Sequence, residues 1–366
     1  MNDVLTTADA WLARGDRVAL ATVVAVRRSA ARPVGAKMAV NERGEVVGAV
    51  SGGCVEVAVV GEAEGVLDGG APCLLRFGTV DGDAWEVGLP CGGEIDVWVE
   101  RHRPSAFGDI VRRNQRGVWV TMLRGPAPGA KLVVGPEGIQ QGSLASSDLD
   151  ARASVRALEL MWRDRSELSE LSELSEDGGV TLFFDVAAPP PRLVIVGAVE
   201  YASYLCTFAR TSGWQPYVVD PRGRFAAGSF PDATEVIASW PAPALRRLGL
   251  DRATAVAVLS HDAKIDDDAL FVALPSDAAY VGAIGSRRAD QARRQRLLGA
   301  GLHPAVLDKL SGPIGLDLGA HSAQGTALSI MAEIVAVYHG HDGGRLSQTT
   351  RARIHSTGRP VTTVHR

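Results

Sequence analysis

The 366-residue sequence lacks the features that mark several classes of protein. Its charge is nearly balanced, because 38 basic residues stand against 42 acidic ones and the net charge is −4. That balance offers no electrostatic basis for binding nucleic acid or an anionic membrane. No apolar run reaches the roughly 18 residues of a membrane span, and the N-terminus lacks the basic and then apolar order of a signal peptide. We therefore expect a cytoplasmic protein that binds neither nucleic acid nor membrane.

Cysteine is scarce as well. The chain has four cysteines, Cys54, Cys73, Cys91 and Cys206, and no two of them form the CxxC pair of a zinc or redox site. In a reducing cytoplasm they are expected to be free thiols. Four scattered cysteines also cannot supply the ligand sets of the usual iron–sulfur clusters. Cys73 lies in an apolar run and Cys206 in a predicted helix, so both are interpreted as core residues.

The composition is that of an ordinary globular protein, with 46% hydrophobic and 22% charged residues. The length suits two or three domains. We expect an α/β protein in which residues 1–186 form an α+β domain with an internal repeat and 192–340 form a Rossmann-like, doubly wound parallel sheet. Residues 187–191 read as a proline-rich linker and 341–366 as a polar tail.

One short stretch, Ser51-Gly52-Gly53-Cys54-Val55-Glu56, combines two glycines with a cysteine. Apolar residues then recur at helical spacing as far as Leu67, which places Cys54 in the first turn of a helix. Unpaired backbone N–H groups and the positive end of the helix dipole would point there and could lower the pKa of the thiol. The alternative is a buried structural cysteine after a glycine turn.

A second cysteine has glycines on both sides, in Gly88-Leu89-Pro90-Cys91-Gly92-Gly93, just before a predicted strand at 94–100. Cys54 and Cys91 therefore both lie beside a glycine pair at the edge of an element. Either they converge on one pocket, or they belong to two unrelated turns.

The first domain repeats itself. Gly-Ala-Lys occurs at 35–37 and at 129–131, and glycines follow in step at 44 and 138 and at 48 and 142. We interpret residues 17–68 and 117–163, approximately, as two β-β-β-α units, although a tripeptide can recur by chance. Asp148, a predicted helix N-cap, stands where the first copy has Cys54, so the scaffold itself does not require the cysteine. The triplets at 166–174 fit neither a helix nor a strand period and are interpreted as a helix tail or low-complexity loop.

The second domain opens with a strand at 192–196, Gly197, a helix to about Thr211, and a strand at 216–219 that ends in Asp220. This order is typical of a dinucleotide-binding fold, with Asp220 placed for a ribose hydroxyl. Val199 replaces the glycine that lets backbone approach pyrophosphate, and Glu200 adds a negative charge, so ordinary NAD(P) binding is doubtful. Further strands are predicted near 234–237, 253–259, 279–284 and 312–316, and helices at about 266–274, 287–298 and 322–339.

Two loops of this domain carry candidate functional side chains. Ser286 and Arg287 lie where a strand runs into a helix, an arrangement suited to an anion or phosphate. The alternative is a Ser286 N-cap followed by solvated arginines. His261 follows another strand and could act as an acid or base, or it is a surface histidine.

The chain resembles the xanthine dehydrogenase accessory family, XdhC/CoxI. The resemblance rests on motifs that occur in order along both domains, at 33–38, 51–56, 91–93, 189–193, 219–222, 284–288, 313–317 and 327–334. The family usually keeps a second glycine and a histidine where this chain has Val199 and Glu200. It also usually has Thr-Pro-Glu-Glu where this chain has Ser322-Ala323-Gln324-Gly325. The ligand of the second domain is therefore expected to be altered or absent, while the first-domain site is expected to be intact.

The resemblance implies a protein that binds molybdenum cofactor, helps its sulfuration and delivers it to a xanthine dehydrogenase-type hydroxylase, with Cys54 as the cofactor-handling cysteine. Its implied partners are the hydroxylase apoprotein and, as a further candidate, a cysteine desulfurase, and a homodimer is implied as well. We favour a non-catalytic maturation factor; the alternative is an NAD(P)-dependent oxidoreductase that uses the Rossmann cleft. The expected cofactor-binding residues are Gly52, Gly53, Cys54, Cys91, Gly92, Gly197, Asp220, Ser286 and Arg287.

Overall fold

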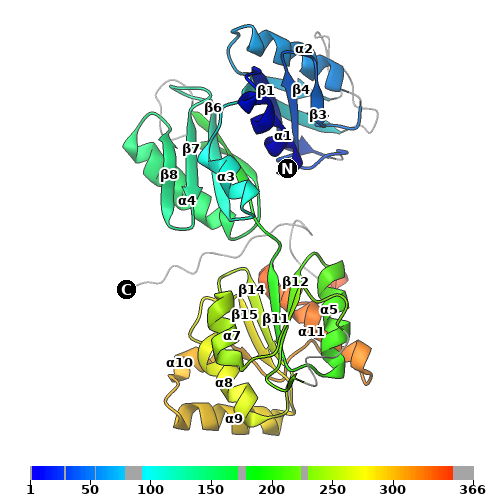
Figure 1. Ribbon diagram of the computed structural model, residues 1–366. Coiled ribbons are helices and arrows are strands. Elements are labelled where there is room, and N and C mark those ends of the chain that lie inside the picture. Colours follow the sequence, from blue (N-terminus) through cyan, green and yellow to red (C-terminus); the bar gives the residue numbers. More distant parts are fainter. Residues whose placement is uncertain are drawn as a thin grey trace. The chain divides into compact units, whose positions relative to one another are not determined.

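The computed structural model describes residues 2–28, 30–53, 55–78, 93–171, 179–223 and 230–348 (Figure 1). The chain divides into two compact units, Met1–Pro189 and Pro190–Arg366. Two antiparallel five-stranded sheets lie in the first unit, and one parallel six-stranded sheet lies in the second. The predicted fold class, α/β with a Rossmann-like second half, is confirmed.

The first unit is built from two copies of one arrangement. The first copy contains β1 (Val18–Arg27), β2 (Lys37–Asn41), β3 (Val46–Gly48), α2 (Glu56–Leu67), β4 (Cys73–Phe77) and β5 (Glu94–Arg101). The second copy contains β6 (Gly117–Arg124), β7 (Lys131–Gly135), β8 (Gly138–Ser143), α4 (Ser147–Met161), β9 (Glu167–Leu171) and β10 (Val180–Ala187). The first sheet has the order β3-β2-β1-β5-β4 and the second has the order β8-β7-β6-β10-β9. The predicted internal repeat is therefore present, and each copy includes two strands beyond its predicted β-β-β-α unit.

The hydrophobic cores of the two copies correspond residue by residue. In each copy the helix covers one face of its own sheet, and its buried positions recur at a fixed offset along the chain. The matching pairs are Val55 and Leu149, Val59 and Ala153, Ala63 and Ala157, Val66 and Leu160, and Leu67 and Met161. Burial at these positions, rather than any one motif, maintains the helical spacing in both copies.

The other faces of the two sheets are also covered. Helices α1 (Asn2–Ala13) and α3 (Ala106–Arg112) pack with β1, β2, β6 and β7 in one shared cluster. A second shared cluster joins Val24 and Trp98 of the first copy to Leu123 and Phe183 of the second. Strand β1 is therefore buried on both faces along most of its length, which explains why its sequence is continuously apolar rather than alternating.

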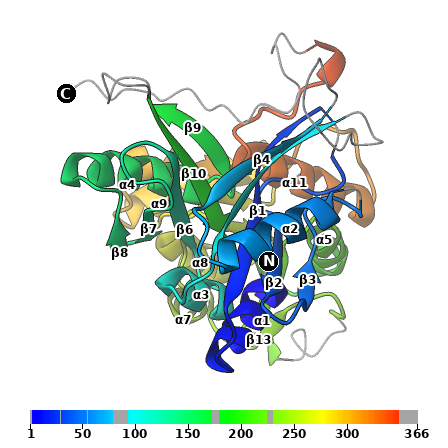
Figure 2. The same ribbon diagram turned by 90° about the horizontal axis from the view of Figure 1, so that it is seen from above.

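Two local predictions in this unit are wrong. The triplets after Ser166 were expected in a helix tail or loop, but residues 167–171 form β9, which lies beside β10 with Leu168 opposite Phe183 (Figure 2). Pairing with a buried neighbouring strand outweighs the weak local pattern. The N-cap of α4 is Ser146, whose side chain accepts a hydrogen bond from Leu149 N, and not Asp148.

The second unit has the strand order β13-β12-β11-β14-β15-β16, and every pairing is parallel. Its strands are β11 (Arg192–Val196), β12 (Gln215–Val219), β13 (Glu235–Ile237), β14 (Thr254–Val258), β15 (Tyr280–Ala283) and β16 (Leu310–Ser311). Its helices are α5 (Glu200–Thr211), α7 (Pro241–Leu248), α8 (Ala263–Ala273), α9 (Arg287–Gly299), α10 (Pro304–Leu307) and α11 (Ala323–Tyr338). Helices α5 and α11 pack on one face of the sheet, and α7, α8 and α9 pack on the other.

The strand predicted at 312–316 is misplaced. The observed β16 is only Leu310–Ser311, and the chain then leaves the sheet. Pro313 has no N–H group to donate to a strand ladder, and the N–H of Gly315 is instead donated to Glu333 of α11 at 2.6 Å. Cys206 is buried as predicted, whereas Cys73 is only half-buried. No helix of the described residues combines the length and apolar character that would be needed to cross a membrane.

Candidate functional site

Three connections leave the same edge of the first sheet. Strands β1 and β2 are antiparallel, so the 28–36 connection lies where β3 ends, with Met38 opposite Gly48. On the other side of β1, Arg27 lies opposite Glu94 and Phe77 lies opposite Ile95. The connections 28–36, 49–55 and 78–93 therefore all begin and end at this edge, which we call the loop edge.

The loop edge carries the first group of predicted site residues. Gly52 and Gly53 lie in the connection between β3 and α2, and a Cβ atom added at Gly52 would lie 3.5 Å from Cβ of Ala31. Cys54, Cys91 and Gly92 lie outside the described residues. The strands that lead into and out of the Cys91 segment, β4 and β5, end and begin at the same edge as the Gly52 turn. The topology thus brings together the two connections that contain the cysteines.

Glu56 fills the hydrogen-bonding groups of the Gly-Gly turn. Its carboxylate accepts hydrogen bonds from Ser51 N at 2.9 Å, Ser51 Oγ at 2.6 Å, Gly53 N at 3.0 Å and Val55 N at 3.2 Å. The sequence predicted free N–H groups at this turn, and for Gly53 and Val55 that prediction is wrong. Helix α2 has no capping side chain at Val55, so the first residue inside the helix reaches back to satisfy the turn.

These hydrogen bonds set the protonation state of Glu56. Burial by itself would raise the pKa of the carboxyl, but the donors from Ser51 and from the backbone outweigh it and hold the pKa below its usual value. Glu56 is therefore ionised near neutral pH. It places a negative charge within the turn that precedes α2.

The lowered pKa of Glu56 predicts a pH dependence of stability. A carboxylate with a depressed pKa stabilises the folded state above the unfolded value, near 4.5, and that stabilisation is lost as pH falls through the folded pKa. Glu56→Gln should therefore lower the free energy of unfolding at pH 7 by about 1 kcal/mol, and by less at pH 3. Urea unfolding at both pH values measures this. Exposed Glu64→Gln in the same helix is the control, and equal losses at the two pH values would contradict the prediction.

The carboxyl edge of the parallel sheet holds the second group of predicted residues. The strand order reverses between β11 and β14, where such folds bind ligands. Gly197 follows β11, Asp220 follows β12, Ser260 follows β14, and Ser286 with Arg287 follows β15. A Cβ atom at Gly197 would lie 2.8 Å from the backbone N of Ser260, so glycine is required for β11 and β14 to approach at the switch point.

Asp220 is already fully bonded. It is completely buried and accepts from Ala198 N at 2.7 Å, Arg222 N at 2.8 Å, Arg222 Nε at 2.9 Å and Arg222 Nη2 at 2.7 Å. A carboxylate offers about four acceptor positions, so none is left for a ribose hydroxyl. Burial would raise the pKa of Asp220, but Arg222 and the backbone donors outweigh it and lower the pKa. Asp220 thus fastens the turn after β11 to the end of β12.

The loop between β15 and α9 is cationic. The Ser286 side chain accepts a hydrogen bond from Ala289 N at 3.2 Å and so caps α9. Arg287 and Arg288 are exposed and form no ion pair with any residue that the structure describes. Beneath the loop, buried Arg293 donates to Ile284 O at 2.6 Å. The N-cap role predicted for Ser286 as one alternative is therefore present, and the two arginines remain open to an anion.

The other candidate of this unit, His261, is exposed, and the described part of the structure places no catalytic partner beside it. Within the described ranges, no group of three or more His, Cys, Asp or Glu side chains is arranged to hold a metal ion. The carboxyl edge therefore offers anion-binding groups rather than an assembled set of acid–base residues.

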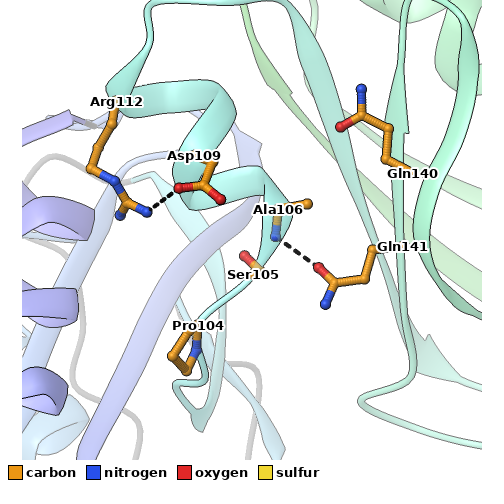
Figure 3. A pocket seen from close by; sticks show the side chains of 7 residues that line it. All are labelled: Pro104, Ser105, Ala106, Asp109, Arg112, Gln140 and Gln141. Atoms are coloured by element: carbon orange, nitrogen blue, oxygen red, sulfur yellow. Dashed lines mark hydrogen bonds and ion pairs between the residues drawn. The ribbon is translucent and has the colours of Figure 1, made fainter.

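A separate pocket of about 440 Å³ lies between α3 and β8, away from every predicted site residue. Figure 3 shows hydrogen bonds between some of its polar groups. Ala106 N donates to Gln141 Oε1 at 2.7 Å, and Arg112 Nη2 donates to Asp109 Oδ1 at 2.6 Å. These two donors are therefore already occupied, and none of the predicted site residues lines the pocket.

Sequence reasoning missed the part that Glu56 plays. Its signal was present, since an acidic residue in the first turn of a helix with no capping side chain can accept hydrogen bonds from the preceding turn. The basic connection after β1 is visible in the sequence as well, but its position beside Gly52 depends on the fold.

Two family models match the chain, one in each unit. Residues 193–334 match the family model described as the XdhC Rossmann domain, and residues 11–78 match that of the XdhC and CoxI family. A Bacillus subtilis protein, named as a probable subunit of xanthine dehydrogenase, is 27% identical over 92% of this chain and 97% of its own length. The molybdenum cofactor insertion chaperone PaoD of Escherichia coli is 28% identical over 89% of this chain and 85% of its own.

The fold also has a relative of known structure. A crystal structure from Bacillus halodurans, described as a xanthine dehydrogenase, aligns with a TM-score of 0.58 and 24% identity. The alignment covers 94% of this chain and 98% of the other. At that identity the likeness concerns the fold alone.

Proposed function

Because the chain belongs to the XdhC and CoxI family, we propose that it is a maturation protein that binds molybdenum cofactor and delivers it, in sulfurated form, to a xanthine dehydrogenase-type hydroxylase. The names of its relatives support this proposal, since one is a molybdenum cofactor insertion chaperone and another a probable subunit of xanthine dehydrogenase. The protein acts in this scheme as a carrier and not as a catalyst. The cofactor is its cargo.

The observation that carries the proposal is the convergence of three connections at the loop edge. The Gly52–Gly53 turn, which leads to Cys54, lies at the same end of the sheet as the strands that flank the Cys91 segment. A thiolate is a soft ligand that suits a molybdenum–sulfur centre. We assign cargo binding to Cys54 with Gly52 and Gly53, and we assign Cys91 and Gly92 to the same site.

The second unit has a supporting part in this proposal. Gly197 and Asp220 hold the turn at the switch point in shape, while Ser286 and Arg287 present an anion-binding loop at the carboxyl edge. The bonds that occupy Asp220 weigh against the alternative of an NAD(P)-dependent oxidoreductase. A cysteine desulfurase partner, a homodimer and a cytoplasmic location stay predictions from the sequence.

An anaerobic titration with molybdenum cofactor tests the proposal. We expect near-stoichiometric binding by the wild type and a loss of at least about 100-fold in affinity, ~3 kcal/mol, for Cys54→Ala. Cys91→Ala is titrated beside it to separate the two thiols. Half-buried Cys73→Ala, in β4 of the same sheet, is the control and should bind like the wild type. Failure of the wild type to bind, in conditions where a hydroxylase apoprotein takes up the cofactor, would overturn the proposal.

A further inference from the structure

Three arginines lie at the end of β1 and in the connection to β2, and two of them pair with acids on β5. Arg27 donates to the buried carboxylate of Asp96, with Nη1 to Oδ1 at 3.2 Å and Nη2 to Oδ2 at 3.0 Å. Arg28 lies 3.7 Å from Glu94. The charge of each of these guanidinium groups is therefore opposed by a neighbouring carboxylate of the same sheet.

Arg32, the third arginine, differs from the other two because it has no acidic partner among the described residues. Its side chain is exposed, and it forms no ion pair or hydrogen bond with any residue in the described part of the chain. Ala31, the residue before it, lies next to the Gly52 turn, with Cβ of Ala31 3.5 Å from a Cβ position at Gly52. The residue directly before Arg32 therefore lies against the Gly-Gly turn, and the exposed Arg32 guanidinium has no partner among the described residues.

The turn itself cannot supply the positive charge that an anion needs. Glu56 occupies the N–H groups of Ser51, Gly53 and Val55 and adds a negative charge beside them. An anionic ligand that approached Gly52 would meet filled donors and a like charge, which is unfavourable unless a cation lies nearby. Of Arg27, Arg28 and Arg32, only Arg32 is not already opposed by a described acid.

We propose that Arg32 recognises the phosphate monoester of the pterin cargo at the loop edge, beside Gly52. This inference rests on the proposed function and adds to it a residue and a ligand group. A guanidinium presents paired N–H donors that match two phosphate oxygens. Gly52, which has no side chain, leaves the backbone of the turn open to close approach of the ligand. Glu56 keeps the turn rigid while Arg32 supplies the charge.

The test is the anaerobic cofactor titration carried out on four forms of the full chain: wild type, Arg32→Ala, Arg32→Lys and Arg124→Ala. Arg124 is the matched control, because it is exposed at the end of β6 in the second copy, where the turn has no cysteine. We expect Arg32→Ala to raise the Kd by about 10- to 100-fold. Arg32→Lys should recover part of the loss, and Arg124→Ala should match the wild type.

Inorganic phosphate, used as a competitor, identifies the group that Arg32 contacts. Phosphate should weaken cofactor binding by the wild type and should have little effect on Arg32→Ala. The salt dependence of binding should also be shallower in Arg32→Ala, because an ion pair exposed to solvent has been lost.

The outcomes separate this inference from the proposed function. Cofactor binding by the wild type with an unchanged Kd in Arg32→Ala would overturn the assignment of Arg32 and leave the carrier function standing. Equal competition by phosphate in both forms would also overturn it. Absence of binding by the wild type would overturn both. Because Arg32 is exposed in a connection, its variants should unfold at the wild-type urea concentration, which excludes misfolding as the cause of a loss.

Discussion

Lys37→Met is expected to destabilise the first unit by about 3–5 kcal/mol, although the substitution keeps the length and apolar stem of the side chain. Lys37 is a lysine of the repeated Gly-Ala-Lys motif, and its ammonium donates to Asp185 of β10 and to Gly35 O at 3.3 Å. The exposed fractions of the two charged side chains are 0% and 4%. Removing the ammonium leaves the Asp185 carboxylate buried without its counter-charge, which is the costly half of such a change.

The Lys37–Asp185 ion pair is one of two lysine–acid pairs that join the two copies. Lys131, the lysine of the second Gly-Ala-Lys, donates to Glu100 of β5 and to Thr121 Oγ1 at 2.7 Å. Each lysine thus reaches an acid of the other copy. Lys131 is 25% exposed and lies 4.3 Å from the centre of the Trp119 ring. Lys131→Met should therefore cost less, about 1–3 kcal/mol, because the lysine side of this ion pair is partly exposed to water, whereas Lys37 is fully buried.

Urea unfolding followed by tryptophan fluorescence measures both effects, because Trp98 and Trp119 are buried in the first unit. The double variant Lys37→Met/Asp185→Leu, which removes both charges of the pair, is the control. Replacing both members of a buried pair by apolar groups can be neutral or stabilising, so the double variant should recover most of the loss. A single variant with wild-type stability, or a double variant no better than the single, would contradict the role of the pair.

These crossed pairs mark the limit of what the sequence could predict. The motif that contains Lys37 was visible because it recurs, but its partner lies 148 residues further along the chain. Nothing local to Asp185 indicates that it faces a lysine, since the pairing depends on how two sheets meet. Strand β9 was missed for the same reason, because Leu168 is fixed by its register with Phe183 rather than by its own neighbours.

In the candidate site, too, some features could be predicted from the sequence and others required the structure. Apolar periodicity and the Gly-Gly pair located the turn before α2, because both are local properties of the chain. The occupation of that turn by Glu56, and the approach of Ala31 to Gly52, required the fold. In the second unit, Asp220 lies directly after β12, as the spacing from Gly197 predicted. The bonds to Arg222 that fill its acceptor positions came only from the structure.

Gly48→Ala and Gly142→Ala are each expected to destabilise the first unit by about 2–5 kcal/mol. The two glycines occupy equivalent positions at the ends of the β2–β3 and β7–β8 hairpins, with φ of +82° and +87°. A Cβ atom would lie 2.3 Å from Lys37 O at Gly48 and 2.1 Å from Lys131 O at Gly142. The left-handed conformation costs a non-glycine residue about 1–2 kcal/mol, and the overlap adds about 1–3 kcal/mol.

Gly44 provides a matched control within the same hairpin. It also has positive φ, +76°, but a Cβ atom there would have no neighbour within 4 Å. Gly44→Ala should therefore cost only the conformational part, about 1 kcal/mol. Urea unfolding of the three variants separates strain of the backbone from overlap. Equal losses for Gly44→Ala and Gly48→Ala would show that the close approach to Lys37 O is not what requires glycine.

Gly48→Ala and Gly142→Ala should differ in their effect on the binding of molybdenum cofactor. Lys37 O accepts the N–H of Ala49 at 3.1 Å, so displacing it at Gly48 moves the chain that leads directly into the Ser51–Val55 turn. Gly142 is followed in the second copy by Ala145-Ser146-Ser147-Asp148, which has no cysteine. Under conditions where both variants are folded, Gly48→Ala should bind molybdenum cofactor about 10-fold more weakly than Gly142→Ala. Equal affinities would mean that the repeat supplies the scaffold without setting the geometry of the turn.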